Sequence, residues 1–291
     1  MIFKGCATAL VTPFKDSGEI DFYSLKNLIE FQIASGIKAL VILGTTGESP
    51  TISQEERTKI IKFCVCLVSK RVPLIVGCGS NSTEITIKHV IEAENLGADG
   101  VLIVTPYYNK CSQFGLIKHY KLVCSCTKLP VIVYNVPSRT GVNILPETML
   151  KLSKIKNIVG IKEASGNINQ IATFCKILPK KVSVYSGDDM LTFPSICLGA
   201  QGVISVTSNC YPELVQTMCD SAFNNDIFNS KRLHEFLFDI NKALFLDVNP
   251  ICVKFYMNLI GFNVGQPRLP LTEPNQEVKQ LLRSVKTSYE N

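Results

Sequence analysis

The sequence predicts an α/β fold, a closed (β/α)8 barrel with a helical appendage at the C-terminus. Three observations support this prediction. Eight short apolar runs rich in β-branched residues alternate with amphipathic helical patterns. These runs are apolar throughout, as expected for parallel strands that are covered on both faces. The length of 291 residues is close to the usual size of one such barrel.

The eight expected strands are short and regularly spaced. They cover Ala7–Val11, Ala39–Leu43, Leu74–Gly77, Gly100–Val104, Val131–Asn135, Ile158–Lys162, Val182–Ser186 and Val203–Val206. The helical patterns between them cover Leu25–Ala34, Glu55–Val68, Glu84–Leu96, Leu116–Cys124, Glu147–Leu152, Ile168–Leu178, Leu191–Leu198 and Pro212–Phe223. Local signals agree: Ser53 and Glu56 form a capping-box pattern, and Pro146 stands at a first helical position.

Three further helical patterns follow the eighth unit, over Leu233–Phe245, Ile251–Leu259 and Glu277–Leu282. We therefore expect a barrel domain over residues 1–224, which carries the site, and a C-terminal helical region over residues 225–291. A doubly wound open sheet is the alternative. It is disfavoured because no glycine-rich dinucleotide-binding loop follows the first strand.

The composition argues against several classes of protein. The net charge of +6 is mild, and the lysines are scattered without an arginine-rich patch, so no nucleic-acid partner is expected. No apolar run is long enough to span a bilayer, and residues 1–12 lack an export signal. We therefore expect a cytoplasmic enzyme without a membrane partner. Its twelve cysteines lack zinc-site spacing and are expected to remain reduced, with no metal.

Lys162 ends the sixth expected strand, at the end where parallel barrels carry their chemistry. An amine confined in a partly apolar pocket loses its proton more readily and becomes a nucleophile toward a carbonyl carbon. Most lysines are instead solvated surface charges. The residues at the other strand ends therefore decide between these two interpretations of Lys162.

Polar residues follow most of the other expected strands. After the second strand, Gly44–Ser49 offers hydroxyls and backbone amides that suit a carboxylate, although an ordinary turn or a phosphate cradle has a similar composition. After the fourth, Tyr107 and Tyr108 form either a packed rim or part of a site. After the fifth, Tyr134 supplies a phenol near the barrel mouth, and Arg139 supplies a planar fork for a carboxylate.

The last two strands are followed by Ser186-Gly187-Asp188-Asp189 and by Ser205. Taken together, the strand ends present an amine nucleophile, a phenol, hydroxyls for a relay and separate donors for two carboxylates. The three histidines lie in helical patterns away from these ends, and we interpret them as structural. The chemistry indicated is Schiff-base formation with a keto acid, followed by carbon–carbon bond formation or cleavage.

In their order and spacing, Gly44–Ser49, Tyr134–Gly141 and Gly160–Gly166 resemble the dihydrodipicolinate synthase (4-hydroxy-tetrahydrodipicolinate synthase) family, whose fold is a TIM barrel. The resemblance extends from the first strand to Arg268-Leu269-Pro270 and covers nearly the whole chain. The family belongs to a superfamily of pyruvate-dependent class I aldolases. N-acetylneuraminate lyase, in the same superfamily, shares the lysine and the strand-five tyrosine, and is the alternative activity.

The resemblance implies a lyase that makes a new carbon–carbon bond in diaminopimelate and lysine biosynthesis. Lys162 would form an imine with pyruvate, and the derived enamine would attack L-aspartate 4-semialdehyde. Tyr134, Thr46 and Tyr108 match the family's proton relay, in which Tyr108 reaches into the site of the neighbouring subunit. No cofactor is implied. A homotetramer, as a dimer of dimers, is the usual assembly, and a dimer is the alternative.

The same resemblance implies the residues that bind the two substrates. Thr45 and Thr46 match positions that hold the pyruvate carboxylate, and Arg139 matches the position that binds the semialdehyde carboxylate. Gly187 and Ile204 match backbone contributors. Arg139 favours the synthase, because the lyase usually lacks this arginine. A barrel without catalysis, kept for binding or scaffolding, would have no need for all of these groups.

Many members of the family bind lysine at the dimer interface as a feedback inhibitor. Of the positions that form that site, this chain keeps Ser49, Asn81 and Tyr107. It has Gln54 and Arg57 where sensitive enzymes often carry histidines, and Ile85 where a glutamate would pair with the lysine amine. Glu84 is adjacent, but one helical step rotates a side chain by about 100°. We therefore expect weak inhibition by lysine, or none.

Overall fold

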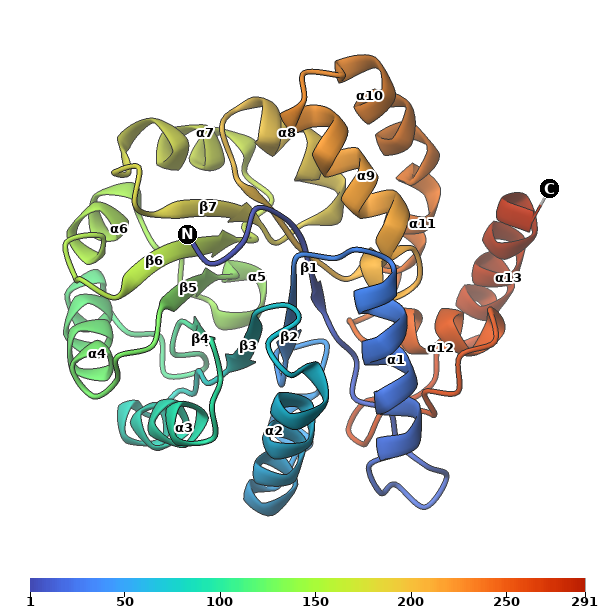
Figure 1. Cartoon of the computed structure of the whole chain (residues 1–291), viewed down its shortest axis with the longest axis horizontal. Coiled ribbons are helices and arrows are strands. Elements are labelled where there is room, and N and C mark those ends of the chain that lie inside the picture. The colour runs from blue at the N-terminus through green and yellow to red at the C-terminus, as the bar shows by residue number, and fades with distance from the viewer. Residues whose placement is uncertain (291) are drawn as a thin grey trace.

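The computed structural model describes residues 1–290 and forms the expected closed barrel. Eight parallel strands pair in chain order, and β8 closes on β1; Figure 1 shows the helices around this ring. The strands are β1 (Gly5–Ala9), β2 (Ala39–Ile42), β3 (Leu74–Gly77), β4 (Gly100–Val104), β5 (Val131–Asn135), β6 (Ile158–Glu163), β7 (Ser183–Ser186) and β8 (Gly202–Ser205). The predicted fold class is confirmed.

The helices of the barrel follow the strands in turn. They are α1 (Phe22–Ala34), α2 (Gln54–Val68), α3 (Thr83–Asn95), α4 (Gln113–Ser125), α5 (Pro137–Thr140), α6 (Pro146–Leu152), α7 (Ile168–Ile177), α8 (Thr192–Cys197) and α9 (Pro212–Phe223). Short 3-10 turns follow β2, β7 and β8, namely η1 (Ser49–Thr51), η2 (Asp189–Leu191) and η3 (Thr207–Asn209). The capping box predicted from Ser53 and Glu56 is present at the start of α2.

Two predicted boundaries differ from the structure in an informative way. The first strand begins and ends two residues earlier than expected, at Gly5 and Ala9. It leaves the sheet at Val11, whose N–H donates to the Asn209 side chain (3.1 Å) rather than to a neighbouring strand. The helix expected over Leu233–Phe245 is wrong as a single element. The chain turns at Leu237, with a ψ of −2°, and forms α10 (Ile227–Phe236) and α11 (Phe238–Ala243).

The C-terminal region continues with α12 (Ile251–Leu259), as predicted, and α13 (Gln276–Glu290), which is longer than the expected Glu277–Leu282. Helix α13 packs against α11 and α12, and these elements lie at one side of the barrel in Figure 1. The three helices therefore flank the barrel, and the segments before and after α12 return to its mouth. Within residues 1–290, no helix is long and apolar enough to cross a membrane.

Two hydrophobic clusters explain why the strands are apolar on both faces. The larger cluster lies between the strands and the helices. The smaller one consists of alternate strand residues that face the barrel interior, including Ala7, Val41, Tyr134, Tyr185 and Ile204. Because successive side chains of a strand point to opposite faces, this alternation decides which residues near each strand end can face the interior.

Candidate active site

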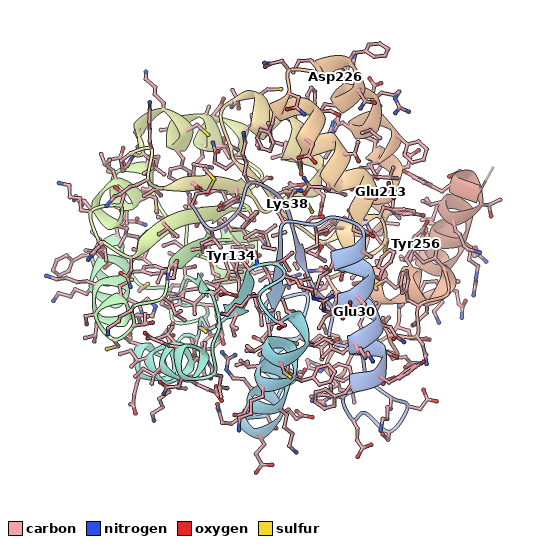
Figure 2. All side chains as sticks on the ribbon, viewed as in Figure 1. Glu30, Lys38, Tyr134, Glu213, Asp226 and Tyr256 are labelled. Atoms are coloured by element: carbon pink, nitrogen blue, oxygen red, sulfur yellow. The ribbon has the colours of Figure 1, made fainter. Side chains whose placement is uncertain are left out.

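Lys162 and Tyr134 lie side by side at the ends of two neighbouring strands. They are register partners of β5 and β6, so the Lys162 side chain points to the same face of the sheet as Tyr134, which belongs to the interior cluster. Both are buried, with 5% of Lys162 and 7% of Tyr134 exposed. The Lys162 Nζ lies 4.5 Å from the centroid of the Tyr134 ring, where an ammonium is attracted by the aromatic face. Figure 2 labels Tyr134 within the ring of strands. The structure thus brings together the predicted amine and phenol.

The residues that follow Lys162 and Tyr134 in their strands point to the opposite face of the sheet and hold this pair in place. Glu163 and Asn135 are also register partners and are buried behind the strands. The Glu163 carboxylate accepts hydrogen bonds from Asn135 Nδ2 (2.8 Å), Gln170 Nε2 (3.1 Å) and the Ser165 N–H (2.8 Å). Both oxygens of this buried carboxylate are therefore occupied by neutral donors, as a buried polar group requires. The network holds the ends of β5 and β6 in register, and with them Lys162.

Gly187 leaves the space that the Lys162 side chain occupies. A Cβ at position 187 would lie 2.9 Å from Lys162 Cε and 2.7 Å from Ala164 Cβ, too close for either contact. Ile204, on β8, packs in the interior cluster that also contains Tyr134. Both residues therefore lie next to the interior groups of the site. Any side chain at Gly187 would have to displace the lysine.

Asp189, the second residue of the acidic pair after β7, has a structural function in the described chain. Asp189 is buried and accepts hydrogen bonds from Ser205 Oγ (2.5 Å) and from the Val206 and Thr207 N–H groups (2.9 and 3.3 Å). Burial raises the pKa of the Asp189 carboxyl, and the Ser205 hydrogen bond opposes that rise. The ends of β7 and β8 are held together by this carboxyl. Ser205 is consequently engaged away from the proposed chemistry.

The loop Gly44–Ser49 lies in a tight conformation next to β3. Thr45 is half-buried and Thr46 is buried. Two residues with side chains, Leu43 and Glu48, have positive φ angles of 55°. Gly77 of β3 permits the close approach, because a Cβ there would lie 2.1 Å from the Leu43 carbonyl oxygen. The loop is therefore packed directly against the neighbouring strand end.

A cavity of about 300 Å³ opens at this end of the barrel. Its lining is largely apolar, with polar groups from the loop after β2, from β5 and α5, and from the C-terminal region. The lining residues with predicted roles are Thr45, Tyr134, Arg139, Ser49 and Tyr107. Lys162 and Thr46 are not in the wall of this cavity. They adjoin it through Tyr134 and Asn249, which do line it.

Arg139 lies at the rim of the cavity, on the short helix α5, and is exposed. Its Nη2 donates to the backbone carbonyl oxygen of Asn249 (3.0 Å). A guanidinium has five N–H donors in a planar fork. Within residues 1–290 that carbonyl is its one hydrogen-bond partner. The remaining donors can therefore bind an anionic group at the cavity mouth.

The C-terminal region contributes to the site in a way that the sequence did not reveal. Asn249 lines the cavity and donates from Nδ2 to Thr46 Oγ1 (2.9 Å). Val248, Pro270 and Leu271 also line it. The only sequence signal was Asn249 and the proline after it, directly before an apolar helical pattern. Nothing in the sequence indicated that residues 249 and 46 meet across the barrel mouth.

Tyr108 is the one predicted catalytic residue that the single chain does not bring to the site. It is 89% exposed, has a φ of 71° and does not line the cavity, whereas its neighbour Tyr107 does. Two of the three positions predicted to bind the lysine effector, Ser49 and Tyr107, line the same cavity as Thr45. The third, Asn81, accepts a hydrogen bond from Asn109 Nδ2 at its backbone oxygen (2.9 Å).

The cysteines and histidines of the described residues do not assemble a second reactive centre. All twelve cysteines are unpaired, and seven of them are buried. Burial raises the pKa of the Cys78 thiol to about 11, which makes it a poor nucleophile. Within residues 1–290, no three His, Cys, Asp or Glu side chains are grouped so that they could hold a metal. His89, His119 and His234 lie in helices, as predicted.

Comparison with known proteins identifies close relatives over the full length. Residues 2–288 match the model of the dihydrodipicolinate synthetase family. The chain is 46% identical over 288 residues to the 4-hydroxy-tetrahydrodipicolinate synthase of Thermotoga maritima, covering 98% of each chain. It superimposes on the dihydrodipicolinate synthase structure from that organism with a TM-score of 0.97 and 45% identity, covering 100% and 99% of the two chains. The structure from Cyanidioschyzon merolae with lysine bound gives a TM-score of 0.96 at 37% identity, covering 99% of each.

Proposed function

Because the chain belongs to the dihydrodipicolinate synthetase family, we propose that it condenses pyruvate with L-aspartate 4-semialdehyde to form 4-hydroxy-tetrahydrodipicolinate. The observation that carries this proposal is the buried Lys162–Tyr134 pair at the end of β6 and β5, next to a cavity with Arg139 at its rim. An amine with a phenol beside it supports imine chemistry. The cavity volume of about 300 Å³ is enough for two small substrates.

Lys162 attacks the ketone carbon of pyruvate, and loss of water gives an imine. The positively charged imine nitrogen accepts electrons, so the methyl group loses a proton and an enamine forms. The enamine carbon bonds to the aldehyde carbon of the semialdehyde. The amino group of that substrate then closes the ring on the imine carbon and releases Lys162. The register of β5 and β6 keeps the Tyr134 phenol beside the amine during these steps.

A phenol alone is a weak acid, with a reference pKa of about 10. Transfer of several protons at neutral pH therefore benefits from a relay to solvent. Thr46 Oγ1 accepts a hydrogen bond from Asn249, so its own proton is directed to another acceptor. We assign this acceptor role to Tyr134, and we place Tyr108 of a neighbouring subunit at the outer end of the relay. The high exposure of Tyr108 supports that placement.

The carboxylates of the two substrates are separated in this proposal. The amides and hydroxyls of Thr45 and Thr46 hold the pyruvate carboxylate, and the unoccupied donors of Arg139 hold the semialdehyde carboxylate at the cavity rim. Arginine binds a carboxylate through two parallel hydrogen bonds, which fixes orientation as well as affinity. Gly187 and Ile204 complete the pocket around the lysine.

A coupled assay with pyruvate and L-aspartate 4-semialdehyde tests the activity directly. The wild type should turn over, and Lys162→Ala should lose all measurable activity, because Lys162 is the one amine that residues 1–290 place over the Tyr134 ring. Cleavage of N-acetylneuraminate is measured in parallel. A wild type that prefers the sugar acid to the semialdehyde would establish the alternative aldolase in place of the synthase.

The assignment of Tyr108 to a neighbouring subunit is tested by complementation. Lys162→Ala and Tyr108→Phe are first assayed alone and then coexpressed and purified as a mixed oligomer. In a mixed dimer, one site combines an intact Lys162 with the Tyr108 of the other subunit. Activity should therefore reappear well above either variant alone. No recovery in a demonstrably mixed oligomer would place Tyr108 outside the relay.

We also propose weak lysine inhibition, because the residues near the predicted effector position are already engaged. Arg57 is buried, and its guanidinium donates to the Gly77 carbonyl oxygen (2.9 Å), to Cys78 Sγ (3.2 Å) and to Glu92 (3.0 Å). Each of its three nitrogens therefore has a partner within the protein, so this guanidinium is not available to bind the carboxylate of an incoming lysine. Tight lysine binding would also need a carboxylate that pairs with the ammonium of the effector.

Position 85 lacks that carboxylate, since Ile85 is 43% exposed on α3, and the adjacent Glu84 is paired with Lys88 (2.8 Å). Titration of the wild type with lysine up to millimolar concentrations should leave activity nearly unchanged. Ile85→Glu should increase lysine affinity by about 10-fold or more, the effect of one charged hydrogen bond. Ile91→Glu, also exposed on α3, is the control. Strong inhibition of the wild type would contradict the proposal.

A further inference from the structure

The loop Gly44–Ser49, which carries Thr45 and Thr46, lies in a backbone conformation that its own sequence does not favour. Leu43 precedes it and Glu48 lies within it, and both have a φ of 55°. Residues with a Cβ rarely adopt this left-handed region, so contacts from elsewhere must hold it. For Glu48, these contacts come from the C-terminal part of the chain.

Lys254 on α12 is the principal contact. Its side chain is fully buried, and its ammonium donates to Glu48 Oε1 (2.8 Å), the Thr12 carbonyl oxygen (3.0 Å) and the Gln266 carbonyl oxygen (3.0 Å). An ammonium has three protons, and each therefore has an acceptor. The ammonium also lies 4.1 Å from the centroid of the Phe14 ring. Lys254 thus joins the loop after β2, the segment after β1 and the segment after α12.

The second oxygen of Glu48 is held from the same side. Glu48 Oε2 accepts from the Arg268 backbone N–H (2.8 Å). Thr12 adds a further constraint, because its Oγ1 donates to the Gly47 carbonyl oxygen (2.8 Å). Among residues 1–290, the Glu48 carboxylate, with 1% of its side chain exposed, is therefore satisfied by Lys254 and Arg268, both from the C-terminal region. Without them, the buried carboxylate would be left without a partner, which it could relieve by taking up a proton or by moving toward solvent with the loop; either change removes the contacts that hold the loop.

We propose that Lys254 is a positioning residue that acts through Glu48 to hold Thr45 and Thr46 where they bind the keto acid and pass its proton. This inference rests on the proposed function, because it assigns the loop a role in pyruvate binding. Lys162 itself stands on β6 and is held by the separate Glu163 network. Loss of the Lys254–Glu48 pair should therefore weaken pyruvate binding and slow turnover while leaving Lys162 able to form the imine.

The test compares the double variant Lys254→Met/Glu48→Gln with the wild type and with Tyr256→Phe. The double variant removes both charges together, a change that buried ion pairs often tolerate without unfolding. Tyr256→Phe is a matched control, because Tyr256 is fully buried on the same helix and bonds to Tyr211 (2.7 Å), not to the loop. Figure 2 labels Tyr256 outside the strand ring. Thermal unfolding verifies that each protein is folded at the assay temperature.

Each protein is titrated with pyruvate, reduced with borohydride and weighed, and kcat and KM are measured separately. We expect the double variant to reach the full mass increase, with a half-saturating pyruvate concentration raised by about 10- to 100-fold and a reduced kcat, as displaced binding groups produce. Tyr256→Phe should match the wild type. If the double variant does not fold, Lys254→Arg replaces it under the same expectations, because it keeps a cation opposite Glu48 and changes the geometry of its donors.

Three results would overturn the inference. The first is a double variant that binds pyruvate and turns over like the wild type. The second is an equal loss in Tyr256→Phe, which would show general damage to α12. The third is a double variant that never reaches the full mass increase, which would show that Lys162 itself was disturbed. A wild type without any pyruvate adduct would instead reject the proposed function, and with it this inference.

Discussion

Two buried carboxylates near the mouth of the barrel, Glu163 and Glu48, are satisfied in opposite ways. Glu163 accepts three neutral donors from its own neighbourhood in the chain, the farthest 28 residues away. Glu48 accepts from the Lys254 ammonium and the Arg268 N–H, which are 206 and 220 residues away. The β5–β6 strand pair, which carries Tyr134 and Lys162, is thus held by residues close to it in the sequence. The loop that carries Thr45 and Thr46 is held instead by residues near the C-terminus.

This difference separates two parts of the proposed reaction. The β5–β6 pair provides the nucleophile and the phenol, and its geometry follows from strand register. The loop after β2 provides binding groups, and its geometry follows from a long-range charge pair. Changes in the first region should affect the chemical steps, and changes in the second should affect substrate affinity and stability.

Apart from the loss of Lys162 itself, Tyr134→Phe should give the largest effect on turnover. The ring that packs beside Lys162 remains, and only the hydroxyl is lost. Removal of a general acid–base group typically costs about 10²- to 10⁴-fold in rate. We expect a fall in kcat of that order with an almost unchanged melting temperature. The relay role would be contradicted by a kcat within a few-fold of the wild type.

Glu48→Gln should be the more destabilising of two matched carboxylate changes. It leaves the buried Lys254 ammonium without its counter-charge, and breaking a buried pair typically costs about 3–5 kcal/mol. Denaturant unfolding monitored by circular dichroism gives the free energy. A loss of less than about 1 kcal/mol, the value typical of an exposed pair, would show that the ion pair is not what holds the loop.

Glu163→Gln should cost less, about 1–3 kcal/mol, because one donor loses its acceptor and no buried cation is left unpaired. The same unfolding measurement applies to this variant. Its pyruvate half-saturation should stay close to that of the wild type, in contrast to variants of the loop. If Glu163→Gln is as destabilised as Glu48→Gln, the distinction between neutral and charged partners does not hold.

The smallest expected effect concerns acid stability. Hydrogen bonds and charge from Arg268 lower the pKa of Glu56 to about 2. A carboxyl with a lowered pKa in the folded state stabilises above its unfolded pKa, and that contribution is lost as pH falls toward the folded value. The wild type should therefore lose about 1–2 kcal/mol more than Glu56→Gln between roughly pH 5 and pH 2, after allowance for solvent screening. Parallel pH-dependent unfolding curves would contradict this account.

The sequence predicted the barrel and most of the site for a physical reason. Strand order and alternation place Tyr134, Lys162 and Gly187 near one another once the barrel closes, because each belongs to a strand end. The contributions of Asn249 and Lys254 could not be predicted in this way. They depend on where a helix outside the repeat packs, and the pairing joins residues 206 positions apart. In the proposed function, Tyr108 acts in the site of a neighbouring subunit, so the sequence of one chain does not show which residues it meets.

Contacts between residues far apart in the sequence also explain why some element boundaries were predicted wrongly. The turn at Leu237 has no glycine or proline to mark it, and this apolar residue continues the helical pattern of the sequence. The early end of β1 is set by Asn209, nearly 200 residues away. Local propensity places an element, and tertiary contacts decide where it ends.

The central claim is that Lys162 forms an imine with pyruvate. Incubation with pyruvate, reduction with borohydride and mass spectrometry of the intact and digested protein test it directly. We predict one reduced pyruvyl group per chain, on the peptide that contains Lys162, in the wild type and in the exposed-lysine control Lys156→Ala. The adduct should be absent from Lys162→Ala. An adduct that persists in Lys162→Ala, or none in the wild type, would contradict the account.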